Sequence, residues 1–200
     1  MSLAATVESY RYRAFAWRSS LSWPKKLLLA LGGAVFIGFL AQVRLPLPWT
    51  PVPVTGQTFA VLLNPVLLGR NWGGISEALY VILGAAGLPW FAGGKAGLAC
   101  LTGPTGGYLV GFVLAAFFLG YMSDRFVRAR SWAGLLGLML FANFLLIHGP
   151  GLLWLAHVTG ATDVAKLLWM GTIPFISGDV LKAVGAATVA FALTPKKGTW

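Results

Sequence analysis

The sequence is poor in charged residues and nearly devoid of cysteine. Only 10% of its 200 residues are charged, whereas a soluble domain carries about 25%. So few charges cannot cover the surface of a water-soluble fold, and the hydrophobic fraction of 58% requires an apolar solvent. Cys100 is the single cysteine, which excludes an intrachain disulfide and a cysteine-based metal site. The composition therefore favours one membrane-embedded domain.

Motifs for ATP hydrolysis and for catalysis are also missing. A P-loop needs Gly, four residues and then Gly-Lys-Ser/Thr; at Gly94-Lys95 a proline replaces the first glycine and an alanine follows the lysine. His148 and His157 lie on opposite faces of an ideal helix, so they do not form a metal pair. We expect both histidines to make local hydrogen bonds, and we expect no catalytic residues, no metal and no cofactor.

Six apolar segments are candidates for membrane spans, because crossing the hydrocarbon core takes about 20 apolar residues. The second is short and contains Pro65, and Gly149-Pro150-Gly151 is expected to kink the fifth or end it early. We therefore expect an all-α bundle of six transmembrane helices. The segments are 27–43, 57–68, 72–88, 106–122, 132–156 and 174–193.

Basic residues are distributed unequally between the predicted loops. If the N-terminus is inside, eleven lie on the inner side and three on the outer side, so the positive-inside rule places both termini in the cytoplasm. Their spacing between apolar runs explains the net charge of +10 without a nucleic-acid partner. The inner residues are Arg11, Arg13, Arg18, Lys25, Lys26, Arg70, Arg125, Arg128, Arg130, Lys196 and Lys197, and the outer ones are Arg44, Lys95 and Lys166.

Residues 1–24 are not apolar enough to insert. Tyr10, Ala14, Trp17 and Leu21 share one helical face, which predicts an interfacial helix on the inner leaflet. No small-residue cleavage site follows the first apolar run, so a removable signal peptide is not expected. We divide the chain into this segment and a membrane domain, 25–200.

Three charged residues lie inside predicted spans: Glu77, Asp179 and Lys182. A charge at the bilayer centre costs about 2.5–3.5 kcal/mol, so such residues usually face a cavity or a partner. Asp179 and Lys182 share a helical face within about 12 Å of its outer end. They form either a self-contained ion pair or part of an outward-facing pocket. Glu77 lies nearer the inner side, where we expect a helix–helix hydrogen bond.

Two predicted outer loops are unlike ordinary polar connections. Residues 45–55 contain four prolines, which keep the segment extended and stiff. Residues 89–105 are rich in glycine, which permits close backbone approach. With Trp90, Phe91 and Lys95 they suit a lid over an amphipathic ligand, and short interfacial loops with belt aromatics are the alternative.

Small residues recur at every fourth position of the first span, at Ala30, Ala34 and Gly38. This spacing allows close approach of helix backbones in lipid. The stripe packs either inside the bundle or against another protein, and the sequence leaves both open.

Four segments together resemble the S components of biotin transporters, the BioY family of energy-coupling-factor systems. The resemblance covers about residues 27–194 in order and spacing. It departs at Trp90, where an aliphatic residue is usual, and at Ser177, where a second proline is common. The segments are 50–57 (TPVPVTGQ), 80–94 (YVILGAAGLPWFAGG), 103–108 (GPTGGY) and 174–182 (PFISGDVLK).

The resemblance implies a six-helix S-component fold in the bacterial inner membrane, with an outward pocket for biotin as the transported ligand. It assigns the acid and base of the sixth helix to Asp179 and Lys182, and an Ala-x-x-x-Ala contact with a transmembrane coupling subunit to Ala30 and Ala34. The expected partners are biotin, membrane lipid, that coupling subunit and ABC-type ATPases, or further copies of the chain if it is solitary.

The chemistry of biotin suggests roles for these residues, because an unpaired buried polar group costs about 1–3 kcal/mol. Asp179 is expected to accept from the ureido N–H groups, and Lys182 to donate to the carbonyl or to hold Asp179. Lys95 or Arg44 would meet the carboxylate, and the opposite orientation stays open. The expected binding residues are Asp179, Lys182, Tyr80, Trp90, Phe91, Lys95, Tyr108, Gln57 and Arg44.

Two functions of other classes remain. A membrane enzyme on a small apolar substrate would use Glu77 with a histidine. A structural subunit of a membrane complex would use the small-residue stripe and need no pocket. Saturable biotin binding without turnover would favour the transporter over both.

Overall fold

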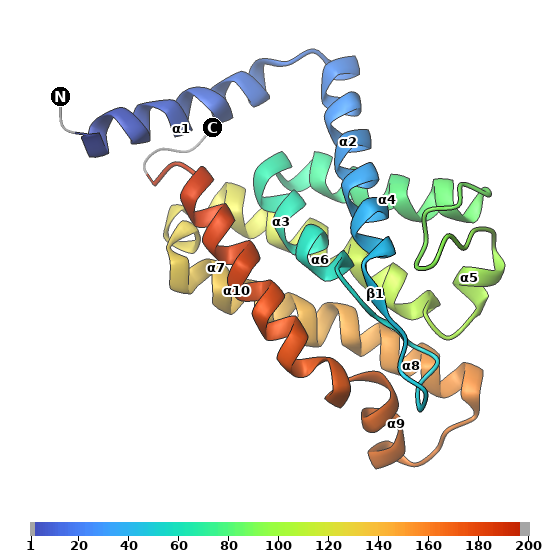
Figure 1. Cartoon of the computed structure of the whole chain (residues 1–200). Helices are drawn as coiled ribbons and strands as arrows, with labels where there is room; N and C mark the ends of the chain where they lie inside the picture. The colour runs from blue at the N-terminus through green and yellow to red at the C-terminus, as the bar shows by residue number, and fades with distance from the viewer. Residues whose placement is uncertain (1–2, 197–200) are drawn as a thin grey trace.

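The structure is a computed structural model, which describes residues 3–196 (Figure 1). Lys197, which was assigned to the inner side, lies outside this range. The α-helices are α1 (Leu3–Ser20), α2 (Trp23–Gln42), α3 (Gln57–Leu68), α4 (Arg70–Ala85), α5 (Ala99–Thr102), α6 (Gly106–Arg125), α7 (Trp132–Phe141), α8 (His148–Thr159), α9 (Val164–Gly171) and α10 (Ile176–Leu193). The other elements are the 3₁₀-helices η1 (Val127–Arg130) and η3 (Ile173–Phe175), the π-helix η2 (Ala142–Ile147), and the strands β1 (Arg44–Leu45) and β2 (Val54–Thr55).

All six predicted spans are helical. Within residues 3–196, four helical stretches are long and apolar enough to cross a membrane: 23–42, 106–125, 132–159 and 164–193. The helix α3 has 12 residues and α4 has 16, below the ~20 that a span needs. Most of α3 is buried, and a short helix is stable at membrane depth when the surrounding protein covers it.

The fifth span does not end at Pro150. The helix continues to Thr159, and the distortion is the π-helical stretch η2 immediately before His148. Pro150 has no N–H for the carbonyl of Leu146, and its ring crowds that oxygen. A π-helical turn is one of the ways in which a helix accommodates such a gap.

The helix α1 lies across one end of the bundle (Figure 1). Arg11 donates to the carbonyl of Ala192 at the end of α10 (2.7 Å), and Arg18 donates to that of Leu67 at the end of α3 (2.7 Å). Phe15 is buried, whereas Tyr10, Ala14 and Trp17 of the predicted apolar face are exposed. The helix thus ties the ends of α3 and α10 together and leaves that face uncovered by the described residues.

Both unusual loops lie at the other end of the bundle. The antiparallel pairs Arg44↔Thr55 and Leu45↔Val54 close the proline-rich loop as a hairpin. An isolated bridge between Phe91 and Lys95 closes a tight turn in the glycine-rich loop. The two loops have little regular structure, and these contacts hold them beside the ends of the helices.

The small residues of α2 are inside the bundle. Ala30 and Ala34 are fully buried, Gly38 is buried, and α2 packs against α4. A Cβ placed on Gly38 would lie 3.1 Å from Cβ of Trp90, so glycine permits that contact. The sequence left two locations open for this stripe, and in the structure it lies in the interior of the bundle.

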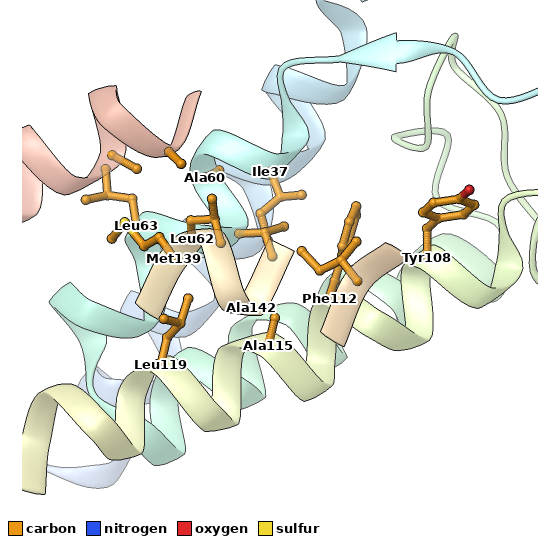
Figure 2. Packing of buried hydrophobic residues seen from close by; sticks show 14 of the residues in the cluster. Ile37, Ala60, Leu62, Leu63, Tyr108, Phe112, Ala115, Leu119, Met139 and Ala142 are labelled. Carbon is orange, nitrogen blue, oxygen red and sulfur yellow. The ribbon is translucent and has the colours of Figure 1, made fainter. Parts of the chain in front are cut away.

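The core next to the site is built by α3, α6, α7 and η2 (Figure 2). Small residues alternate there with larger ones, which lets the helices approach closely. The side chains include Ala60, Leu62, Leu63, Ala115, Leu119, Met139 and Ala142.

Candidate functional site

A cavity of about 440 Å³ lies at the end of the bundle that carries the two loops. The first two turns of α3, α6, α8 and α10 line it from one side, and the proline-rich and glycine-rich loops line it from the other. Small-molecule sites typically enclose about 300–1,000 Å³ and are mostly apolar with a few polar groups. The cavity fits that description.

Asp179 is the centre of a polar network in this cavity. Its side chain is only 3% exposed. One carboxylate oxygen, Oδ1, meets Lys182 Nζ at 2.6 Å and Thr58 Oγ1 at 3.3 Å. The other, Oδ2, meets Asn143 Nδ2 at 3.0 Å and His148 Nε2 at 2.9 Å. A carboxylate has about four acceptor positions, so all of them are in use.

The π-helix η2 brings two of these partners to the same side. Asn143 and His148 are five residues apart, which separates them by about 140° on an ideal α-helix. In a π-helix the hydrogen bonds run from i to i+5, so residues at this spacing lie one above the other. Both side chains therefore reach the same oxygen of Asp179.

The hydrogen bonds of His148 are not the local ones that we expected from the sequence. Besides Asp179, it lies 3.0 Å from the carbonyl of Gly171 and 3.1 Å from the hydroxyl of Thr172 through Nδ1. Its ring packs edge-on against Tyr108. These contacts fix the imidazole ring with Nε2 beside the carboxylate and Nδ1 beside the Gly171 carbonyl. His157 is exposed and packs beside Trp154.

Lys182 connects the network to the mouth of the cavity. Its ammonium donates to Asp179 and to the carbonyl of Thr55 in the hairpin (2.9 Å). An ammonium has three donors, which leaves one beyond these two contacts. The pair with Asp179 is therefore part of a larger network that borders a cavity.

Six of the nine predicted binding residues line the cavity, and three do not. Tyr80 and Trp90 form a layer behind it, because Trp90 donates to the Tyr80 carbonyl (2.9 Å) and Tyr80 takes a hydrogen bond from Gln57 (2.6 Å). Arg44 lies outside, with its guanidinium beside Gly93. The lining residues are Gln57, Phe91, Lys95, Tyr108, Asp179 and Lys182.

Sequence reasoning missed several residues of the site. Thr58, Phe112, His148 and Phe175 also line the cavity, and Asn143 holds Asp179 from behind. Single aromatic or hydroxyl residues on apolar helices are typical of any core, so no local signal separates them. The usual helical period also places Asn143 and His148 on different faces.

Glu77 takes no part in this site. It is fully buried on α4 and does not line the cavity. Within residues 3–196 neither carboxylate oxygen has a hydrogen-bond partner, and neither has the hydroxyl of Ser76 beside it. The side chain of Asn64, on the neighbouring α3, interacts with the Glu77 carboxyl, and the expected helix–helix hydrogen bond stays a prediction. Asn64 also donates to the carbonyl of Gly33 (3.1 Å).

Comparison with known proteins gives consistent matches along the chain. The sequence profile of the BioY family matches residues 13–198. A probable biotin transporter BioY of Methanothermobacter thermautotrophicus is 51% identical over 140 residues, which cover 68% of this chain and 89% of that protein. The biotin transporter BioY of Rhizobium etli is 36% identical over 171 residues, or 84% and 91% of the two chains. The crystal structure of the S-component for biotin from an ECF-type ABC transporter matches with a TM-score of 0.79 and 26% identity, and the match covers 90% of this chain and 97% of that one.

Proposed function

This chain belongs to the BioY family, and from that premise we propose that biotin binds in the cavity around Asp179 and Lys182. The chain is the biotin-binding membrane subunit of an uptake system, an S component, and not an enzyme. The observation that carries the binding proposal is the fully hydrogen-bonded carboxylate of Asp179 on the wall of a 440 Å³ cavity.

The ureido ring of biotin is the end that suits this network. It carries two N–H donors and a carbonyl, and each needs a partner once it is out of water. All acceptor positions of Asp179 are occupied, and the bond from Thr58 is the longest of the four at 3.3 Å. We infer that a ureido N–H replaces Thr58, while the remaining donor of Lys182 meets the ureido carbonyl.

The rest of the cavity suits the apolar body and the carboxylate. Phe112, Phe175 and Tyr108 line its walls, and aromatic walls of this kind bury an apolar ring and chain. Lys95 is the lining cation of the glycine-rich loop at the mouth. It is the group placed to meet the biotin carboxylate, whereas Arg44, the other candidate from sequence, does not line the cavity.

The chain does not supply the energy for transport, since its sequence has no P-loop. The partners proposed are a transmembrane coupling subunit and ABC-type ATPases, with a self-oligomer as the arrangement for a solitary chain. Ala30 and Ala34 are fully buried on α2, so a coupling subunit reaches them only if α2 moves. An exposed face of the bundle is the simpler docking surface.

The orientation in the membrane is also a proposal. Basic residues crowd the end of the bundle where α1, the α3–α4 junction and the end of α6 meet, and the cavity opens at the opposite end. By the positive-inside rule the crowded end is cytoplasmic. Both termini then lie inside, the cavity opens outward, and residues 1–24 form a segment apart from the membrane domain 25–200.

A biotin titration of the detergent-purified chain tests the binding proposal. We expect saturable binding without chemical change of biotin in the wild type. Asp179→Asn should bind roughly ten- to hundredfold more weakly, because hydrogen bonds to a charged group contribute about 1.5–3 kcal/mol. Asp124→Asn, an acid-to-amide change at the other end, should bind as the wild type does.

Thr58→Val tests whether a ureido N–H of biotin replaces the Thr58 hydroxyl as a donor to Asp179. The valine keeps the shape of threonine and leaves one acceptor position of the carboxylate free. We expect biotin affinity equal to or above that of the wild type. Wild-type affinity in Asp179→Asn, or a large loss in Thr58→Val, would contradict this arrangement.

A further inference from the structure

A second hollow, of about 540 Å³, lies at the end of the bundle opposite the biotin cavity. It forms where α1 turns into α2, where Gly69 joins α3 to α4, and where α6 ends. Nothing in the proposed binding of biotin uses this hollow. Its lining combines cations, aromatic rings and a helix start.

The hollow is strongly basic. Four cations line it and a single carboxylate, Asp124, opposes them. That carboxylate is already engaged, because it accepts the backbone N–H of Arg70 (2.8 Å) and pairs with Arg18 (3.5 Å). At least three positive charges are left over. The cations are Arg18, Lys26, Arg70 and Arg125.

The start of α4 adds to this positive potential. The helix has 16 residues and begins at Arg70, and Asn71 and Trp72 of its first turn also line the hollow. First-turn N–H groups have no acceptor within their own helix, and the helix dipole places partial positive charge there. The N–H of Arg70 is taken by Asp124, and those of Asn71 and Trp72, together with the cations, suit a phosphate group.

An apolar stripe on α6 runs from this hollow toward the middle of the bundle. Val110, Leu114, Phe117 and Tyr121 are spaced by three or four residues and are 53%, 47%, 40% and 41% exposed. Residues at this spacing share one helical face. Tyr121 belongs to both features, since it lines the hollow and its ring lies 5.0 Å from the guanidinium of Arg70.

We propose that this hollow binds the phosphate-bearing headgroup of an anionic phospholipid, with one acyl chain along the α6 stripe. The phosphate chemistry is shared with free inorganic phosphate, but the stripe favours the lipid because it continues the site into the hydrocarbon. Basic pockets between membrane helices are recognised sites for such headgroups. The site needs only that this end of the bundle meets the membrane surface.

The test uses the full chain in detergent, titrated with phosphatidylglycerol, phosphatidylcholine or inorganic phosphate and followed by native mass spectrometry and thermal unfolding. Phosphatidylglycerol should bind saturably and raise Tm, and the other two should not at equal concentration. Arg70→Gln/Arg125→Gln should bind it roughly 30-fold more weakly, at about 1 kcal/mol per cation near the surface. Asp124 still accepts the backbone N–H of residue 70 in this variant, because that bond does not involve the side chain.

Lys25→Gln/Arg128→Gln is the charge-matched control, because both residues are exposed and neither lines the hollow. It should bind phosphatidylglycerol within about threefold of the wild type, a difference well under 1 kcal/mol. Unchanged biotin binding in both variants shows that they are folded. If the two double variants bind phosphatidylglycerol with equal affinity, the lipid does not bind in this hollow. If inorganic phosphate binds and raises Tm as strongly as the lipid does, the ligand is phosphate and not a lipid.

Discussion

Two buried acids, Asp179 and Glu77, occupy opposite situations in the same bundle. Asp179 is 3% exposed and accepts from four different side chains. Glu77 is fully buried, and within residues 3–196 its two oxygens have no hydrogen-bond partner. Both looked alike in sequence, as acids inside an apolar span. Burial alone therefore does not identify a binding group.

What separates the two acids is the shape of the protein around them. Asp179 stands where a π-helix, a proline-rich hairpin and the first turn of α10 meet beside a cavity. Glu77 is fully buried on α4 and does not line the cavity. A fully paired charge next to a cavity can exchange one partner for a ligand, whereas a buried acid away from the cavity has no ligand within reach.

Breaking the ion pair at Asp179 should have the largest effect. In Lys182→Met the buried carboxylate loses its cation, and we expect a loss of about 3 kcal/mol in stability, the lower end for removing one partner of a buried pair. Biotin binding should also fall. Thermal or denaturant unfolding checks the first effect and a biotin titration the second.

The double variant Asp179→Asn/Lys182→Met serves as the control, because it removes both charges and should recover part of the lost stability. A single Lys182→Met variant as stable as the wild type would show that the pair is not what holds Asp179.

His148→Phe removes one hydrogen-bond donor to Asp179 and keeps the aromatic volume. We expect biotin to bind roughly tenfold more weakly, as for the loss of one hydrogen bond to a charged group. His157→Phe, at the exposed end of α8, should bind as the wild type does. Equal affinities of the two variants would remove His148 from the network.

Lys95→Met tests the mouth of the cavity and the orientation of biotin. Lys95 is exposed, and an exposed charge pair contributes about 0.2–1 kcal/mol, so affinity for biotin should fall by up to about fivefold. Affinity for biotin methyl ester, which lacks the carboxylate charge, should not change. If Arg44→Met weakens the binding of biotin but not of the methyl ester, and Lys95→Met does not, then Arg44 and not Lys95 meets the carboxylate.

Glu77→Gln should have the smallest effect. The amide keeps the shape of the side chain and removes the possibility of an unpaired buried charge, which is costly in an apolar interior. We expect unchanged biotin affinity and a Tm equal to or above that of the wild type. A large loss of binding would show that the two acids are coupled.

The helices and much of the site were predictable from the sequence. Apolar length and the charges at segment ends located the four long apolar spans and the shorter helices α3 and α4, because the membrane demands both. Asp179, Lys182 and Lys95 were identified because charges inside spans and between proline- and glycine-rich segments stand out. These signals are local, and each can be read within one turn or one loop.

The remaining features depend on tertiary packing. The π-helix before Pro150 changes the face on which Asn143 lies, and a period of 3.6 residues hides that change. Tyr80 and Trp90 were expected at the cavity wall and do not line it, because an aromatic residue beside a loop does not reveal which side faces the cavity. The position of α2 against α4 likewise decided that Ala30 is interior.

Cys100 allows the most direct test of where biotin binds. It is the single cysteine of the chain, it is half-buried, and it lines the cavity. We predict that biotin, at a concentration just sufficient to saturate the wild type, slows the labelling of this thiol by a maleimide in the wild type and slows it much less in Asp179→Asn. A wild-type labelling rate that does not change when biotin is bound would contradict the placement of biotin in this cavity.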